Sequence, residues 1–206
     1  MGILPAIENV WASEQKPRIK VATVLTTFHF RSHAHVLLEN FLNPYYFNGE
    51  RTDPGVDVVA FYVDQFHEKD MARSVAEKYG IPIYPTIAKA LCRGGSKLAV
   101  DAVLAIGEHG DYPLTDKGQR MYPRKRFFDE IVNVFEQSGR GAPIFNDKHL
   151  SYRFDWALEM VETARRMDIP FLAGSSVPLA QRRPPLELTP GVKITEAVSI
   201  HGGPVE

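Results

Sequence analysis

The chain has 206 residues and a formal net charge of −1, with 44% hydrophobic and 24% charged residues. That length fits one domain with a short extension, and the apolar content can fill a core of normal size. The near-neutral charge gives no general attraction to nucleic acid or to an anionic membrane, so we expect neither as a partner. The single cysteine, Cys92, excludes an internal disulfide and a multi-cysteine zinc site. Because no signal peptide and no apolar run of ~18 residues is evident, we expect a cytoplasmic protein.

Short apolar runs alternate with amphipathic segments along most of the chain. Strands are predicted over residues 19–27, 56–63, 81–84, 100–106, 143–146 and 170–173. Helices are predicted over residues 32–43, 69–79, 87–92, 123–138 and 152–167. Residues 44–55 contain Pro, Asn, Asp and Gly and are predicted to be a loop. The alternation predicts an α/β fold with a doubly wound, mostly parallel Rossmann-like sheet of strand order 3-2-1-4-5-6.

The two ends of the chain are patterned differently from the middle. We expect residues 1–18 to be an N-terminal lead, residues 19–178 the Rossmann-like domain, and residues 179–206 a C-terminal extension that could be the remnant of a second domain. Residues 192–200 alternate apolar and polar, which predicts one more strand. A lone strand has an unpaired edge, so we expect a homodimer formed through this segment.

Polar residues gather in four turns that follow predicted strands, at residues 29–35, 107–112, 146–149 and 174–178. Open α/β proteins bind ligands outside the carboxyl ends of their strands, near the point where strand order reverses. We therefore expect the four turns to line one crevice that binds a small molecule. The basic run from Arg120 to Arg126 is interpreted as a solvated loop and first helical turn, with a phosphate-binding patch as the alternative interpretation.

The histidines and carboxylates of these turns allow a metal-centred hypothesis. The candidate ligands of a divalent metal are His33, Glu108, His109, Asp147 and His149. A metal-bound water would then be the nucleophile of a hydrolase, acting for example on a lactone or an ester, or of a lyase. Against this, His33 and His35 open a predicted helix, where residues two positions apart diverge, so the simpler interpretation is a capping region with a surface histidine.

Three segments of the chain share the pattern of one known protein family. The first runs from Ala76 to Tyr84 with the later Val100-Asp-Ala-Val run, the second is the pair Asp147-Lys148, and the third runs from Glu159 to Gly174. They resemble, in turn, the third-strand region, the Glu-Lys-Pro motif at the end of the fifth strand, and the next helix and strand of the nucleotide-binding half of the glucose–fructose oxidoreductase/inositol dehydrogenase (Gfo/Idh/MocA) family. The resemblance is to a bacterial branch, without that family's C-terminal domain.

The resemblance implies an NAD(P)-dependent sugar or polyol oxidoreductase. Lys148 would orient the nicotinamide and polarise the substrate hydroxyl, His149 or His109 would accept its proton, and Asp147 stands beside them as a fourth catalytic candidate. The cofactor-binding candidates on this hypothesis are Asp64 at the adenosine ribose, Thr27, Ser32, His33 and Gly107.

Two departures from the family pattern limit this hypothesis. The first strand runs into a turn without glycine, where the family's glycines admit a pyrophosphate, so NAD or NADP is expected to bind weakly. His149 also replaces the proline of the motif. A non-catalytic binding or assembly module using the same crevice is the third hypothesis, beside the oxidoreductase and the metal-dependent hydrolase or lyase.

Overall fold

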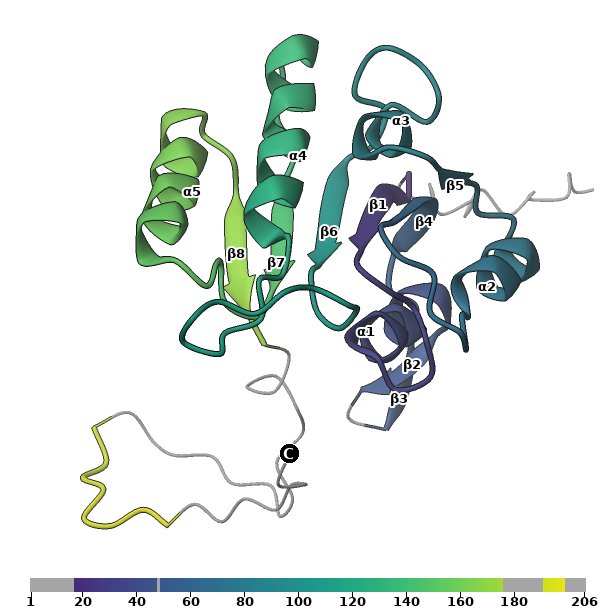
Figure 1. The fold of residues 1–206 in the computed structure, drawn as a ribbon. Helices are drawn as coiled ribbons and strands as arrows, with labels where there is room; N and C mark the ends of the chain where they lie inside the picture. Colours follow the sequence, from purple (N-terminus) through teal and green to yellow (C-terminus); the bar gives the residue numbers. More distant parts are fainter. Residues whose placement is uncertain (1–16, 48, 176–190, 199–206) are drawn as a thin grey trace, which may run out of the picture. The chain divides into compact units, whose positions relative to one another are not determined.

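The computed structural model describes residues 17–47, 49–175 and 191–198, and it contains the predicted parallel sheet (Figure 1). The sheet strands are β1 (Ile19–Leu25), β4 (Val56–Val63), β5 (Ile83–Tyr84), β6 (Ala102–Ile106), β7 (Ile144–Asp147) and β8 (Phe171–Gly174). They pair in the order β5-β4-β1-β6-β7-β8, and every pairing is parallel. This is the predicted 3-2-1-4-5-6 order, with its reversal between β1 and β6.

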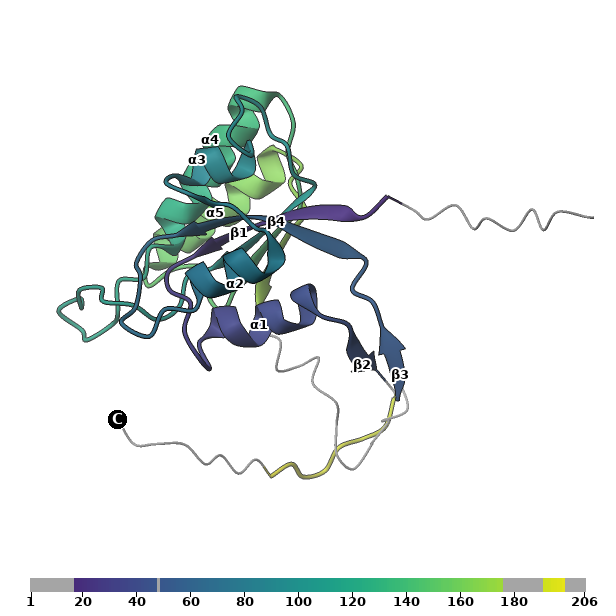
Figure 2. The same cartoon turned by 90° about the vertical axis from the view of Figure 1, so that its right-hand side faces the viewer.

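Helices cover both faces of the sheet (Figure 2). The helices are α1 (His33–Leu42), α2 (Ala72–Tyr79), α3 (Ile87–Leu91), α4 (Arg124–Ser138) and α5 (Phe154–Arg166). Residues of α1 and α2 pack in one apolar cluster with the sheet, and residues of α3, α4 and α5 pack in another. The Rossmann-like α/β fold class is therefore confirmed.

The side chains of β1 point alternately into the two apolar clusters, one on each face of the sheet. Val21 and Leu25 belong to the cluster on the α1 side, whereas Ala22 and Val24 belong to the cluster on the α4 side. Successive side chains of a strand point to opposite faces, so a strand buried on both sides is mostly apolar along its buried part; in β1 the buried Thr23 is the exception. Packing on both faces fixes the position of β1. Its carboxyl end therefore lies near the middle of the edge formed by the carboxyl ends of the strands.

Two sequence-based predictions of local structure were wrong. Within the expected loop, β2 (Tyr45–Phe47) and β3 (Glu50–Thr52) form an antiparallel hairpin. The glycine and proline signals hid the strand-forming run Tyr45–Phe47, and Gly49 supplies the positive φ of 84° near the turn.

The expected strand at residues 192–200 is also not seen in its described part. Residues 192–198 are irregular, and the side chains of Val192, Ile194 and Val198 are exposed. A strand forms by pairing with a neighbour, and residues 192–198 have none among the described residues.

The chain divides into two compact units, Met1–Gly174 and Ser175–Glu206. The domain boundaries and the homodimer stay predictions, and most of the expected N-terminal lead and C-terminal extension lies outside the described residues. No helix in the described ranges is long and apolar enough to cross a membrane.

Candidate functional site

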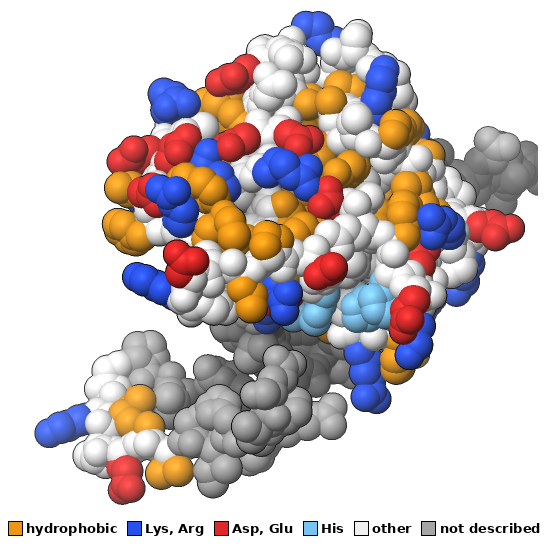
Figure 3. Space-filling view, viewed as in Figure 1, with side chains coloured by type: hydrophobic (Ala, Val, Ile, Leu, Met, Phe, Trp, Pro, Cys, Tyr) orange, Lys and Arg blue, Asp and Glu red, His pale blue; other side chains and the backbone are white. Residues whose placement is uncertain are grey.

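Three of the four polar turns meet at the carboxyl edge of the sheet. His33 of the β1–α1 region lies 2.6 Å, Nδ1 to Oδ2, from Asp147 at the end of β7. The His33 ring packs edge-to-face on His109 of the β6–α4 turn, with 5.0 Å between ring centroids. Histidine side chains are grouped on this side of the molecule in Figure 3. These contacts bring three of the four expected turns together at one edge; of the fourth turn, only Gly174 and Ser175 are described.

The start of α1 places His33 at this edge. Ser32 is fully buried, and its hydroxyl caps the helix by accepting from the backbone N–H of His35 and of His29. This double contact fixes the turn, so that His33 becomes the first helical residue. His35, two positions further along α1, lies against the Phe30 ring. His33 and His35 therefore do not point to one site as a pair of ligands would.

The pair of His33 and Asp147 has the geometry of an oriented imidazole. The side chain of Asp147 is 3% exposed and that of His33 is 26% exposed. An ionised carboxylate only accepts hydrogen bonds, so Nδ1 of His33 donates to Asp147 and Nε2 is the ring nitrogen that Asp147 does not bind. Burial of Asp147 is compatible with its charge because this partner is present.

His109 occupies a constrained turn between Glu108 and Gly110. Its φ is 67° and that of Gly110 is 101°, both in the left-handed region. The side chain of Gln65 holds the turn from outside, donating to the Asp111 carbonyl at 2.9 Å and accepting from its N–H at 2.8 Å. Burial, followed by the neighbouring His33 and His29, lowers the pKa of His109. The ring is therefore neutral at neutral pH, and its Nε2 is buried without a hydrogen-bond partner.

A buried arginine joins the turns after β6 and β7. Arg124, the first residue of α4, is 1% exposed and donates both to the Glu108 carboxylate and, at 3.0 Å, to Nε2 of His149. The aliphatic part of its side chain fills the space over Gly107, where an added Cβ would lie 2.7 Å from Cγ of Arg124. The interpretation of this basic run as solvated was wrong for Arg124, because Glu108 compensates its charge inside the protein.

The Asp147–Lys148–His149 segment turns sharply after β7. Lys148 has a φ of 67°, and its N–H donates to the Gly174 carbonyl at 2.9 Å. The buried amide of Asn146 donates to the carbonyls of Asp147 and His149, which holds the turn closed. Partial burial and then the Arg124 guanidinium lower the pKa of His149. Since Arg124 occupies its Nε2, His149 is less suited than His33 to accept a proton.

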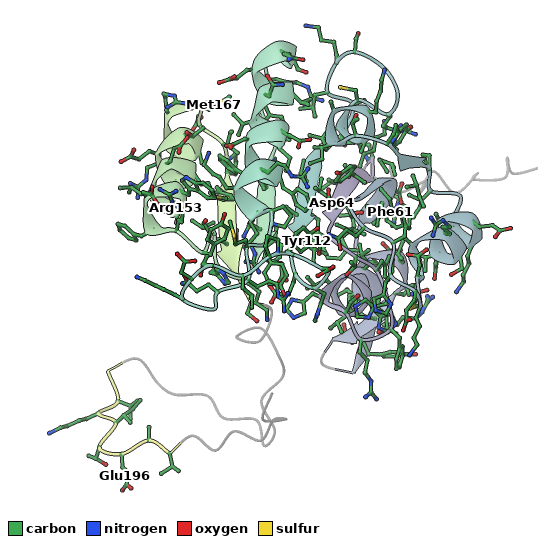
Figure 4. All side chains as sticks on the ribbon, viewed as in Figure 1. Phe61, Asp64, Tyr112, Arg153, Met167 and Glu196 are labelled. Atoms are coloured by element: carbon green, nitrogen blue, oxygen red, sulfur yellow. The ribbon has the colours of Figure 1, made fainter. Side chains whose placement is uncertain are left out.

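Asp64, expected at a ribose, is engaged by the protein instead. Its carboxylate accepts from the hydroxyls of Tyr62 at 2.6 Å and Tyr112 at 2.7 Å and pairs with Arg126. Figure 4 shows Asp64 and Tyr112 next to each other. Burial raises the pKa of Asp64, but these three donors outweigh it, and the pKa lies below its ordinary value. A ribose hydroxyl would have to displace one of them.

The five expected metal ligands do not form one coordination site. Glu108 and His149 are both bound to Arg124, whereas His33 and Asp147 are bound to each other. Within the described ranges, no group of three or more His, Cys, Asp or Glu side chains is arranged to hold a metal ion. The metal-dependent hydrolase or lyase therefore has no support in this geometry.

The turn after β1 does not fit a dinucleotide bound in the ordinary way. Phe28 is 2% exposed and packs into the core, and Thr27 is equally buried. In glycine-rich turns the missing side chains let the backbone approach a pyrophosphate. Here those side chains are present, Ser32 is committed to the helix cap, and the space beside Gly107 holds Arg124. Among the expected cofactor-binding residues, His33 keeps a ring nitrogen, Nε2, that its partner Asp147 does not bind.

The comparisons with known proteins agree with the fold. No family model matches the sequence, and no curated protein matches it. Myo-inositol 2-dehydrogenase from Lactobacillus plantarum has a similar structure, with a TM-score of 0.50 and 12% identity over 77% of this chain and 36% of that one. A dehydrogenase, MviM, from Clostridium difficile has a TM-score of 0.48 and 12% identity over 76% and 39% of the two chains. An oxidoreductase from Agrobacterium radiobacter, in complex with NAD+, L-tartaric acid and magnesium, has a TM-score of 0.48 and 15% identity over 76% and 35%.

The class defined by these findings is a Rossmann-type α/β domain with the fold of the inositol dehydrogenase. The expected resemblance is confirmed at the level of the fold and over one part of the relative. This chain spans about a third of the length of the dehydrogenases that it matches.

Sequence reasoning missed several residues that organise the site. They are Arg124, Tyr112, Arg126 and Asn146. Asn146 lies in the predicted turn and could have been found as an amide able to bond neighbouring backbone. The other three carry no local signal, because their partners are distant in the sequence.

Proposed function

We propose that this chain is a Rossmann-type domain related to the NAD(P)-dependent sugar and polyol oxidoreductases, with a degenerate nucleotide site. On this proposal the crevice binds a small hydroxylated ligand. The observation that carries the proposal is the hydrogen bond between His33 and Asp147, at the edge where this fold places its ligands.

The proposed roles follow from the contacts of each group. Asp147 holds the tautomer of His33, so that Nε2 of His33 accepts the proton of a ligand hydroxyl. His109, kept neutral by its lowered pKa, is the second acceptor. Lys148 brings an ammonium group to the same turn, where it can polarise a ligand oxygen. His149 supports the site through Arg124.

Dinucleotide binding is expected to be weak, and NADH and NADPH separate this proposal from a competent dehydrogenase. Titration calorimetry should give a Kd of about 1 mM or weaker for both, because the turn after β1 has no glycine to let its backbone approach a pyrophosphate. A submicromolar Kd would show that the turn opens to admit the pyrophosphate and that the site is intact.

The ligand crevice is tested separately by NMR with polyols and hydroxy acids, each at about 10 mM. Signals of His33 and His109 should shift with at least one of them, and His33→Gln should abolish the effect. His35→Gln is the matched control, since His35 lies on the same helix but contacts Phe30. The absence of any shift across both ligand classes would leave a non-catalytic assembly module as the better interpretation.

A further inference from the structure

The two edges of the sheet differ in how well they are closed to another strand. β5 consists of Ile83 and Tyr84 and lies between Pro82 and Pro85, and a very short strand flanked by proline is a protected edge. β8, at the other end of the strand order, is the uncharged segment Phe171–Gly174. Within the described ranges, no strand pairs with its outer side. The β8 edge is therefore the one that is open to pairing.

The hydrogen bonds of β8 show which of its backbone groups point outward. The Pro170 carbonyl accepts from β7 at 2.9 Å, and the Gly174 carbonyl accepts from the turn after β7 at 2.9 Å. Alternate residues of a strand direct their backbone groups to the same neighbour, so Phe171 and Ala173 direct their N–H and C=O groups away from β7. Outward backbone groups of this kind are a template for another strand.

The side chain between these two residues adds an apolar contact to the same edge. The Phe171 ring packs on Phe128 of α4, with 5.1 Å between ring centroids, so Leu172 points to the opposite face of the sheet. Leu172 is 63% exposed, although strands of parallel sheets are ordinarily buried on both faces. The middle of β8 therefore exposes backbone groups and an apolar side chain together.

Helix α5 carries an apolar stripe beside this edge. It packs in the same cluster as Phe171, at the end of the sheet (Figure 1). Met160 is its fully buried residue, and Glu159 pairs with Lys125 of α4. Three apolar side chains lie at helical spacing on the side away from α4: Phe154, Leu158 and Val161. Because Phe154 is 83% and Leu158 45% exposed, the stripe extends the open surface of β8.

The charges of α5 fit a second copy of the same helix. Asp155 lies in its first turn, and Arg165 and Arg166 lie in its last turn. A two-fold axis across the β8 edge places two α5 helices antiparallel, so the acidic turn of each copy meets the basic turn of the other. Asp155 also pairs with Arg153, and its carboxylate is exposed enough to take a second guanidinium.

We propose that two copies of this chain pair through β8, antiparallel, about a two-fold axis at Leu172. Phe171 of each copy lies opposite Ala173 of the other, and each such pair exchanges two backbone hydrogen bonds. The two Leu172 side chains meet in the pair between them, and the α5 stripes pack against each other on the opposite face. This surface is distinct from residues 192–200 and does not depend on the function proposed for the crevice.

Disulfide cross-linking of the full chain tests this geometry. Facing residues of a non-hydrogen-bonded pair have Cα atoms about 4.5 Å apart, within the range of a disulfide. Under mild oxidation, Leu172→Cys should therefore give a covalent dimer on a non-reducing gel. Tyr46→Cys, a similarly exposed position in β2, is the control and should stay a monomer, and the native Cys92 is buried. Cross-linking of Val198→Cys but not of Leu172→Cys would overturn the proposal, as would equal cross-linking of Leu172→Cys and Tyr46→Cys.

Light scattering of the unmodified full chain at about 200 μM should give the mass of two chains. Leu172→Lys places like charges opposite each other on the axis and should weaken dimerisation by about tenfold or more. Because Leu172 is exposed, this variant should fold normally, and Tyr46→Lys should leave the dimer unchanged. A monomeric wild type, or equal weakening by both variants, would contradict the proposal.

A charge exchange tests the antiparallel arrangement of α5. Asp155→Lys and Arg165→Glu should each weaken dimerisation by about fivefold, because each places like charges together across the axis. Both substitutions in one chain should restore the affinity to within about twofold of the wild type. A double variant that dimerises no more tightly than the single variants would overturn this arrangement.

Discussion

Two aspartates at the carboxyl edge, Asp64 after β4 and Asp147 at the end of β7, hold different kinds of partner. Their side chains are 15% and 3% exposed. Asp64 is bound by two phenols and a guanidinium, whereas Asp147 is bound by the imidazole of His33.

The difference lies in whether the partners keep a polar atom that the carboxylate does not bind. Burial and the neighbouring Asp64 raise the pKa of Tyr112 and of Tyr62. The pKa of Arg126 is also raised, because its hydrogen bonds outweigh its burial. His33, by contrast, bonds Asp147 through Nδ1 and has a second ring nitrogen that this carboxylate does not bind. The comparison teaches that one strand-end carboxylate can hold neighbouring side chains together, whereas another orients a single imidazole.

The largest expected effect on stability is the loss of the hydrogen bonds that the Asp64 carboxylate accepts. Asp64→Ala leaves two phenol hydroxyls and Arg126 without their acceptor, so the free energy of unfolding should fall by about 3 kcal/mol. Urea unfolding measures it. Asp57→Ala is the control, since Asp57 lies in β4, the strand that Asp64 follows, but pairs with Arg18 at the surface. That control should cost under about 1 kcal/mol, and an equal loss in both variants would refute this role of Asp64.

Removal of the other carboxylate should cost less stability. In Asp147→Ala the partner, His33, is partly exposed and can bond to water, so a loss of about 1–2 kcal/mol is expected. Asp147→Asn keeps an acceptor for Nδ1 and should cost under about 1 kcal/mol. The same unfolding series measures both, and a larger loss for Asp147→Ala than for Asp64→Ala would reverse the comparison.

Acid should reduce the stabilisation that the ionised Asp64 carboxylate provides. The pKa of Asp64 is lowered by folding from about 3.9, so its ionised form stabilises the native state above that pH, and this is lost as pH falls through the folded pKa. The stability difference between the wild type and Asp64→Asn should therefore shrink between about pH 5 and pH 2. A constant difference over that range would contradict the assignment.

The smallest effect is a change of slope near neutral pH. The pKa of His109 is lowered by burial from about 6.5, so its contribution is complete above that pH and is lost as pH falls through the folded pKa. Asparagine tolerates the positive φ of this position. His109→Asn should therefore make the free energy of unfolding vary less with pH between about pH 7 and pH 5. His35→Gln should not reduce this variation, and equal curves for wild type and His109→Asn would exclude this role.

The sequence predicted the sheet well because its signals are local. Ser32 and Thr86 cap the helices expected to follow them, and Gly80 ends α2 in the left-handed conformation. These short-range signals, with right-handed crossovers, determine the strand order. The order in turn brings His33, His109 and Asp147 to one edge, as predicted.

The partners within that edge were not predictable in the same way. Tyr112 lies 48 positions from Asp64, and Arg124 lies 16 and 25 positions from Glu108 and His149. A buried arginine or a tyrosine bound to a carboxylate depends on which side chains share a space after folding. The sequence pattern identified the positions at the ends of the strands. It could not show that Asp64 is bound by two tyrosines and an arginine, whereas Asp147 is bound by a histidine.

Arg124 makes the two turns that it joins a single unit of local unfolding. Opening of the Glu108 turn alone, or of the His149 turn alone, leaves the buried guanidinium short of one partner. The free energy needed to open either turn alone is therefore higher than its share when both turns open together. Amide protons of the two turns should then exchange with solvent in one cooperative event, and a molecule held at one turn would slow exchange at the other.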